Sequence, residues 1–290
     1  MIPVACVAQT DDVLGEVPIW CPVEQALYWA DIFKPAINRY LPASGRVTSW
    51  TPPEKLGSFA LRKAGGLLIA ARSGLAFYEP QSAAFERIVD PEPDLPGNLL
   101  NDGKCDRKGR FWVGSMDKKL ESPTGRLHRF DPDRTTQTFE RDVWVPNSIA
   151  WSPDDRLMYF ADTWRDVIYV YNFDLEAGEI TDRRVFATTE EGPGKPDGST
   201  VDAAGFLWNA EWDGGRVVRY APDGRIDRVI ELPVSRPTSC AFGGPNLDVL
   251  YVTTATFRLD REERARQPLA GGLLAVDVGV CGLPEPRFAG

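Results

Sequence analysis

The sequence predicts an all-β fold, a six-bladed β-propeller with four-stranded antiparallel blades around a central channel. The first observation is an internal repeat in which a polar residue, an apolar strand, a tight turn and a second apolar strand follow one another, most clearly at residues 101–112 and 197–208. The second is its period. The second strands of six copies begin at residues 27, 67, 111, 157, 207 and 250, and a spacing of about 40 to 50 residues is that of propeller blades.

Length and composition agree with one domain. The chain has 290 residues, 43% of them apolar, and its 24 prolines and 26 glycines are spread along it as turn residues. A closed propeller uses its whole length as one unit. We therefore expect a single domain over residues 1–290.

The first half of the chain supplies three blades. Apolar strands alternate there with turns rich in Gly, Pro and Asp, the pattern of antiparallel hairpins. Residues 90–97 read as a rigid loop, and residues 114–122 as a long connection that forms a lid or rim. Besides the repeats themselves, the expected strands are 14–20, 26–31, 37–40 and 47–50, then 59–62, 67–70 and 75–78, then 127–130.

The second half supplies the other three blades. Only residues 260–266 have a helical pattern, and they are highly charged. The N-terminal strand 3–8 is expected to complete the blade that holds the C-terminus, which closes the ring and hides a strand edge. The expected strands are 148–151, 157–162, 167–171 and 184–186, then 199–202, 207–212, 216–220 and 227–230, then 240–242, 250–253 and 272–276.

Charge and termini narrow the class of protein. With 33 basic and 42 acidic residues the net charge is −9, which disfavours nucleic acid and anionic membranes as partners. No signal peptide or membrane span is recognisable, so we expect a cytoplasmic protein, and no obligatory protein partner is inferred. The five cysteines are scattered and odd in number, which predicts reduced thiols.

A polar side chain stands at the same place ahead of the first strand in four repeats. The first strand of each blade lines the channel, so these side chains should converge at one mouth. Blades two and six have Gly57 and Thr238 there, which leaves the cluster one-sided with space for a ligand. The four residues are Glu16, Asn101, Asn147 and Asp197.

Oxygen donors of this kind suit a hard divalent cation such as Ca²⁺, Mg²⁺ or Mn²⁺. The single histidine, His128, falls in a later strand, so a zinc site built on two or three histidines is excluded. Each polar residue taken alone is better explained by hydrogen bonds to turn backbone. Their shared register favours the metal.

Several motifs together resemble the regucalcin (senescence marker protein)/gluconolactonase family of sugar lactonases, over essentially the whole chain. The resemblance implies a six-bladed propeller that holds one divalent metal through Glu16, Asn147 and Asp197, with Asn101 contacting the substrate or the water at the metal. Ca²⁺ is the first choice for the ion, and Mg²⁺, Mn²⁺, Fe²⁺ and Zn²⁺ are the alternatives. The motifs are Leu-Gly-Glu-Val-Pro-Ile-Trp at 14–20, Asn-Asp-Gly-Lys at 101–104, Gly-Ser-Met at 114–116, Asn147 before Trp-Ser at 151–152, Pro-Asp-Gly at 196–198 and Pro-Leu-Ala-Gly-Gly at 268–272.

The chain departs from the family pattern at four positions. Val17 and Ser148 stand where the family usually has Gly, Leu99 replaces a substrate-binding Arg, and Lys119 replaces a Glu. The metal set is intact and the substrate set is altered. Lys119 is therefore a substrate-binding candidate: Lys118 and Lys119 suit an acidic substituent on the substrate, although exposed lysines more commonly form a solvated surface.

The hypothesis for function is hydrolysis of a sugar-derived γ- or δ-lactone to an aldonic acid, in carbohydrate catabolism. The metal polarises the lactone carbonyl, Asp197 accepts the proton of the attacking water, and Asn101 orients the lactone or that water. A Ser-His-Asp triad is disfavoured, because no Gly-x-Ser-x-Gly elbow is present and His128 lies far from the cluster. Two alternatives stay open, a calcium-binding regulatory propeller without turnover and a scaffold that binds proteins.

Overall fold

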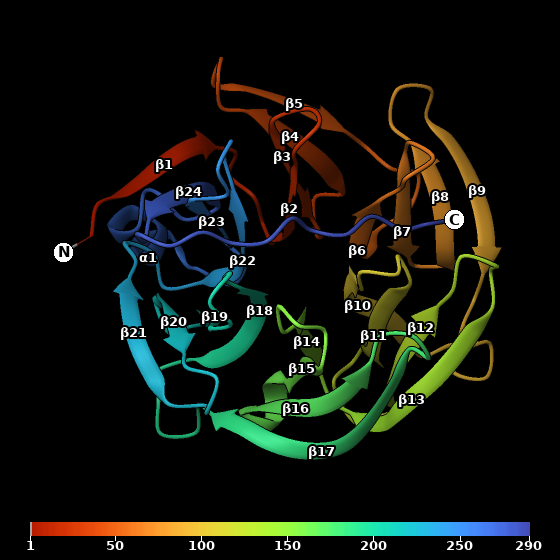
Figure 1. The fold of residues 1–290 in the computed structure, drawn as a ribbon. Coiled ribbons are helices and arrows are strands. Elements are labelled where there is room, and N and C mark those ends of the chain that lie inside the picture. The colour runs from red at the N-terminus through yellow and green to blue at the C-terminus, as the bar shows by residue number, and fades with distance from the viewer. Residues whose placement is uncertain (1) are drawn as a thin grey trace. The chain divides into compact units, whose positions relative to one another are not determined.

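The computed structural model describes residues 2–290 and contains six four-stranded antiparallel sheets, the blades of a six-bladed β-propeller (Figure 1). The predicted fold class is confirmed. The chain divides into two compact units with three sheets each. Unit 1 comprises the described residues of Met1–Trp50 together with Thr189–Pro284, and unit 2 comprises Thr51–Thr188 and Glu285–Gly290. That the whole chain is one domain stays a prediction.

Unit 1 holds blades one, five and six. The N-terminal strand β1 pairs with β24 in blade six, with Val4 opposite Val276, as predicted. The helix α1 (Arg261–Arg266) also confirms its prediction, and a capping box formed by Asp260 and Glu263 begins it. The strands are β2 (Gly15–Cys21), β3 (Ala26–Asp31), β4 (Ala36–Leu41) and β5 (Arg46–Trp50); β18 (Lys195–Val201), β19 (Leu207–Trp212), β20 (Arg216–Tyr220) and β21 (Ile226–Glu231); and β1 (Val4–Gln9), β22 (Pro237–Gly243), β23 (Val249–Thr254) and β24 (Gly272–Asp277).

Unit 2 holds blades two, three and four. The fourth strands of blades two and three, β9 and β13, were not predicted from the sequence. The 3₁₀ turn η1 (Thr163–Arg165) follows the second strand of blade four. The strands are β6 (Leu56–Leu61), β7 (Leu67–Ala71), β8 (Gly74–Glu79) and β9 (Ala84–Val89); β10 (Asn98–Cys105), β11 (Phe111–Asp117), β12 (Gly125–Phe130) and β13 (Thr136–Val143); and β14 (Pro146–Trp151), β15 (Leu157–Asp162), β16 (Val167–Asp174) and β17 (Glu179–Thr188).

The prediction of a long connection over residues 114–122 was wrong at its start. Strand β11 continues to Asp117, with Ser115 opposite Leu100 and Met116 opposite Leu99. The ladder to β10 keeps this segment extended, so only residues 118–124 connect β11 to β12.

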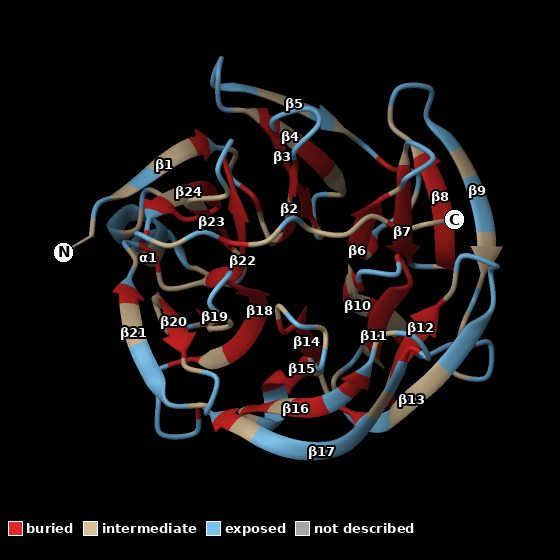
Figure 2. Ribbon diagram, in the orientation of Figure 1, coloured by how far each residue is buried: buried red, intermediate tan, exposed pale blue. Residues whose placement is uncertain are grey.

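Burial follows the order of strands in each blade. The first three strands are largely buried, whereas outer strands such as β9 and β17 are mostly exposed or half-buried (Figure 2). Three fully buried tryptophans, Trp29, Trp112 and Trp208, lie in the second strands of blades one, three and five. Each indole N–H donates to a buried aspartate, respectively Asp12, Asp106 and Asp202.

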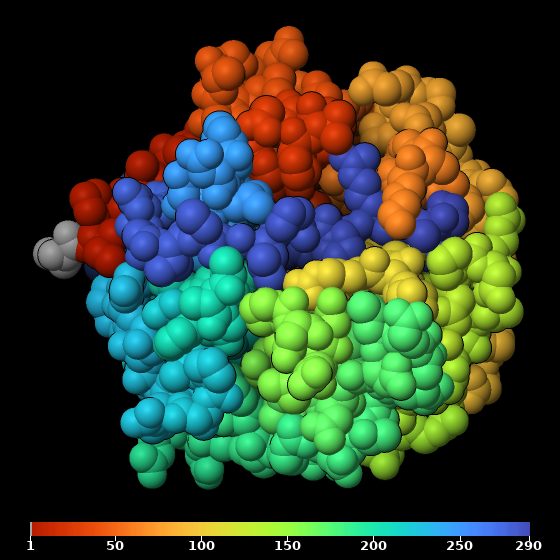
Figure 3. Space-filling view, in the orientation of Figure 1, coloured from red at the N-terminus to blue at the C-terminus, as the bar shows by residue number. Residues whose placement is uncertain are grey.

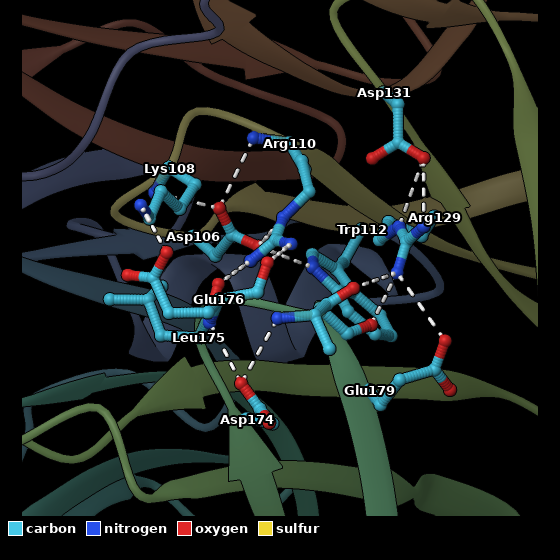
Figure 4. Close-up of polar contacts among 12 residues, drawn as sticks. Asp106, Lys108, Arg110, Trp112, Arg129, Asp131, Asp174, Leu175, Glu176 and Glu179 are labelled. Carbon is cyan, nitrogen blue, oxygen red and sulfur yellow. Dashed lines mark hydrogen bonds and ion pairs between the residues drawn. The ribbon is translucent and has the colours of Figure 1, made fainter.

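The turns between first and second strands are held by two of these aspartates. Asp106 is fully buried and accepts from the backbone N–H groups of Lys108 and Arg110, from Arg110 Nε at 2.7 Å and from Trp112 Nε1 at 3.0 Å (Figure 4). Asp202 repeats the arrangement, with Arg219 as its guanidinium partner at 2.6 Å. A buried carboxylate that is paired and hydrogen-bonded in this way makes the turn rigid.

The C-terminal segment follows these same turns, at the ends of the first strands away from the predicted site residues. In unit 1 the N–H of Ala203 donates to Cys281 O at 2.9 Å. In unit 2 the N–H of Phe288 donates to Leu61 O, and the ring of Phe288 stacks on Phe130 with centroids 5.2 Å apart. Figure 3 shows the last residues in dark blue on the visible face. The repeat pattern did not predict this segment.

Two smaller expectations concern cysteines and the membrane. All five cysteines are free thiols, as their number and scatter predicted. Among residues 2–290 no helix is long and apolar enough to cross a membrane.

Asp106→Ala should lower the free energy of unfolding by about 3 kcal/mol or more, because it leaves a buried guanidinium without its partner. Glu176→Ala is the matched control. Glu176 pairs with Lys108 on the exposed side of the same network (Figure 4), and loss of an exposed pair costs about 1 kcal/mol or less. Urea denaturation of both variants measures the difference. Equal losses would contradict a structural role for Asp106.

Asp12→Asn should change how stability depends on pH. Burial raises the pKa of Asp12 to about 7, although the hydrogen bond from Trp29 opposes the shift. Because the folded state holds this proton more tightly than the unfolded chain, its stabilisation is complete below about pH 4 and is lost as the pH rises through 7. The variant should therefore exceed the wild type in stability at pH 8 and lose that advantage toward pH 4, as measured by urea unfolding across this range. If the free energies of unfolding of the two proteins change in parallel with pH, the prediction is refuted.

Candidate functional site

Four predicted site residues, Glu16, Asn101, Asn147 and Asp197, each lie at an irregularity in the first strand of their blade. The first and second strands lose register between Glu16 and Ile19, between Leu100 and Gly103, between Asn147 and Ala150, and between Pro196 and Ser199. At each place the first strand has one residue more than its partner. A bulge of this kind re-aims a side chain away from the regular alternation, and bulges are common beside active sites.

The bulge imposes an unusual backbone at two of these sites. Val17 and Ser148, directly after Glu16 and Asn147, have φ angles of 54° and 60°. This left-handed region costs a residue other than glycine about 1–2 kcal/mol. The two positions where the family usually has Gly, Val17 and Ser148, are therefore strained. Such strain is typically kept at functional sites.

In unit 1, neighbouring elements hold Glu16 and its strand in place. Glu16 is half-buried, and its Oε2 accepts the N–H of Val17 at 3.1 Å. The segment ahead of it is held by Asp31, a 1% exposed carboxylate that accepts the N–H groups of Val13 at 2.8 Å and Leu14 at 3.2 Å.

Asp197 lies in the same unit, buried at the entry of β18. Its strand packs closely against β22, because a Cβ atom on Gly198 would lie 2.0 Å from Ser239 Oγ. Only glycine permits this approach. On the other side of β22, Thr238 donates to Gly15 O. Strands β2 and β18 thus both pack against β22, and Glu16 and Asp197 lie at the entries of two strands that share a neighbour.

In unit 2 the two predicted carboxamides touch. Asn101 Nδ2 donates to Asn147 Oδ1 at 3.2 Å and to Pro146 O at 3.0 Å. Asn147 is 6% exposed, and its own Nδ2 donates to Thr163 Oγ1 at 2.8 Å. Thr163 thereby orients the Asn147 amide, so that Oδ1 faces Asn101 and one oxygen lone pair stays available for a ligand.

Thr163 and two aspartates are residues that the sequence analysis missed. Asp162, 1% exposed, accepts the N–H groups of Trp144 and Val145 just ahead of Asn147, as Asp31 does ahead of Glu16. The signal was present: both aspartates follow an alanine at the end of the second strand of a repeat that carries a site residue. They position the entries of the two strands.

Local packing accounts for the residue types at the equivalent places in blades two and six. A Cβ atom on Gly57 would lie 2.1 Å from Leu100 O, so no side chain fits there. Thr238 is fully buried and donates its hydroxyl hydrogen within unit 1.

The donor chemistry of the predicted metal set fits a hard divalent cation. Glu16 and Asp197 are carboxylates in unit 1, and Asn147 is an oriented carboxamide in unit 2. Between residues 2 and 290 no three His, Cys, Asp or Glu side chains cluster as a metal site, and the predicted set holds only two side chains of those types. An oxygen-only set suits Ca²⁺, Mg²⁺ or Mn²⁺. That the three residues converge on one ion stays a prediction.

Neither His128 nor Lys119 belongs to a bulged first strand. His128 is 1% exposed in β12, where its Nε2 lies 3.1 Å from Glu92 Oε1 and its Nδ1 lies 3.0 Å from Thr138 Oγ1. It connects β12 to the 90–97 loop through Glu92. Lys119 is exposed in the 118–124 turn, and its backbone N–H donates to Asp117. Its contact with substrate stays a prediction.

Known proteins resemble this chain over nearly its whole length. The family model described as SMP-30/Gluconolactonase/LRE-like region matches residues 14–256. A 6-deoxy-6-sulfogluconolactonase from Pseudomonas putida is 40% identical over 98% of both chains, and an L-arabinolactonase from Azospirillum brasilense is 39% identical over 98% of this chain and 94% of its own. A solved calcium-binding protein, regucalcin from Agrobacterium tumefaciens, superposes with a TM-score of 0.94 at 31% identity, covering 99% of this chain and 97% of its own.

The chain belongs to the SMP-30/gluconolactonase/LRE-like family. This confirms the resemblance that the motifs of the first strands had indicated.

The strain at Ser148 is testable by two substitutions. Ser148→Gly should be more stable than Ser148→Ala by about 1 kcal/mol, because both remove the hydroxyl group and only glycine relieves a φ of 60°. Urea unfolding measures the difference between the two variants. If alanine is the more stable replacement, the backbone at this bulge is not strained.

Proposed function

We propose that the protein is a divalent-metal-dependent hydrolase that opens a sugar lactone to the aldonic acid. The chain is a lactone-hydrolysing enzyme of its family, since relatives named as lactonases match it over 98% of its length. The observation that carries the proposal is the placing of oxygen donors in the bulged entries of the first strands, with Asn147 oriented by Thr163.

In this proposal four residues share three roles: they hold the cation, accept a proton and orient the lactone. Glu16, Asn147 and Asp197 hold the cation. A divalent cation supplies Lewis acidity toward the lactone carbonyl and acidifies water. Asp197 accepts the proton of the attacking water, because a carboxylate within reach of that water can act as general base. Asn101 orients the lactone through its amide, a role that its contact with Asn147 supports.

The relatives support a sugar lactone as substrate class and leave the sugar open. Their names include a sulfonated hexonolactone and a pentonolactone as substrates. The regucalcin structure, named as calcium-binding, supports Ca²⁺ as the first choice of ion. A calcium-binding propeller without turnover is disfavoured, because the lactonases are the more similar of these relatives. Location in the cytoplasm and independence of nucleic acid rest on composition.

Hydrolysis of an aldonolactone panel by chelator-treated protein tests the proposal. Added Ca²⁺, Mg²⁺, Mn²⁺, Fe²⁺ or Zn²⁺ should restore turnover of at least one lactone. Asp197→Ala should reduce that turnover by 10³-fold or more, roughly the loss expected when a general base and metal ligand is removed. Asp223→Ala removes an exposed turn carboxylate and should leave turnover unchanged. Folded protein that hydrolyses no lactone with any of these ions would refute the proposal.

A further inference from the structure

A cavity of about 200 Å³ lies in unit 2, beside the strand that carries Asn101. Its walls come from the β7–β8 turn, the 90–97 loop, the entry of β10 and the end of β11. It is smaller than the roughly 300–1,000 Å³ of pockets that enclose a whole small ligand, so it suits one part of a larger molecule. Residues that line it include Arg72, Asp90, Glu92, Leu99 and Lys118. We refer to it as the Leu99 cavity.

Two cations line the Leu99 cavity without an acidic partner. Arg72 is exposed in the β7–β8 turn, and only its backbone N–H is engaged, with Lys55 O at 2.8 Å. Lys118 Nζ donates to Pro96 O at 2.9 Å, which places the ammonium group against the 90–97 loop. Neither side chain takes part in any ion pair among the described residues.

The acidic groups of the cavity are largely compensated. Glu92, 4% exposed, lies 3.1 Å from His128 Nε2 and 3.6 Å from Arg126 Nε, and Asn98 Nδ2 donates to it at 3.1 Å. Burial alone would raise the pKa of Glu92, but the hydrogen bonds from His128, Ser115 and Asn98 lower it below its ordinary value. This leaves Asp90 as the one lining carboxylate without a cationic partner, against two cations.

The cavity is placed to meet the far end of a substrate. Leu99 and Asn101 are two residues and therefore about 7 Å apart along β10, and both are half-buried, whereas Leu100 between them is buried. That span matches the carbon chain of a hexose in scale. A lactone whose reacting end contacts Asn101 can thus direct its opposite carbon toward Leu99, Arg72 and Lys118. Lys119, one residue on, does not line the cavity.

We propose that the Leu99 cavity binds an anionic substituent, a carboxylate or sulfonate, at the end of the lactone remote from the scissile bond. The inference rests on the proposed lactonase function and names its substrate class. Arg72 contributes a planar set of donors that fits a carboxylate or sulfonate, and Lys118 contributes a second positive charge. The loss of a family Arg at Leu99 is then offset by cations from two neighbouring turns.

Steady-state kinetics on matched lactones test this. Wild-type protein should hydrolyse C6-carboxylate and C6-sulfonate analogues of gluconolactone with a kcat/KM at least tenfold above that of gluconolactone. Arg72→Ala and Lys118→Ala should each lower this preference about tenfold, as expected for a lost charged hydrogen bond, and chiefly through KM. Arg72→Lys should keep part of the preference, because it retains the charge and loses the planar donor set. Arg156→Ala, a substitution on an exposed turn of unit 2, should leave kcat/KM unchanged for both the neutral and the anionic lactones.

Calorimetric binding of the products makes the cavity testable apart from catalysis. Wild-type protein should bind C6-sulfonated gluconate more tightly than gluconate, and Arg72→Ala should remove the difference. Selective binding without turnover of any lactone would refute the proposed hydrolysis and support the cavity's role. Equal hydrolysis of neutral and anionic lactones, or equal effects of the Arg72 and Lys118 variants on both, would overturn the inference and leave the lactonase standing.

Discussion

One extra residue at the entry of each first strand is the constraint on which the candidate site depends. In a regular strand, side chains alternate between faces, and Glu16 or Asn147 would follow that alternation. The bulge re-aims them, at the cost of left-handed backbone at Val17 and Ser148. Asp31 and Asp162 stabilise the segments just ahead of the bulges through backbone hydrogen bonds.

Carboxylates have different roles at the two ends of the first strands. At the turns, Asp106 and Asp202 are fully buried and are each matched by a guanidinium and a tryptophan N–H. At the entries, Glu16 and Asp197 stand in bulged backbone, and their oxygen atoms are the proposed metal ligands. Stability is concentrated at one end and chemistry is proposed at the other, so loops near the site can vary with little loss of fold.

The substrate side of the proposed enzyme is built differently from the metal side. Glu16, Asn147 and Asp197 are part of the repeat. Arg72 and Lys118 lie in turns between the second and third strands of blades two and three, and the repeat does not constrain these turns. Such turns accept substitution more readily than first strands do. Substrate choice can therefore change within this family while the reaction is kept, which agrees with the two different sugars in the relatives' names.

The sequence by itself determined the fold class and the six-fold repeat, because the period of apolar strands and turns is local and recurs in every blade. It also predicted Glu16, Asn101, Asn147 and Asp197 as candidate site residues through their shared register. Only the tertiary structure revealed the contact of Asn101 with Asn147, the role of Thr163 and the continuation of β11 to Asp117. Only the tertiary structure showed that Arg72 and Lys118 line the same cavity. These features join residues far apart in the chain or depend on ladder pairing, and no local pattern encodes such distances.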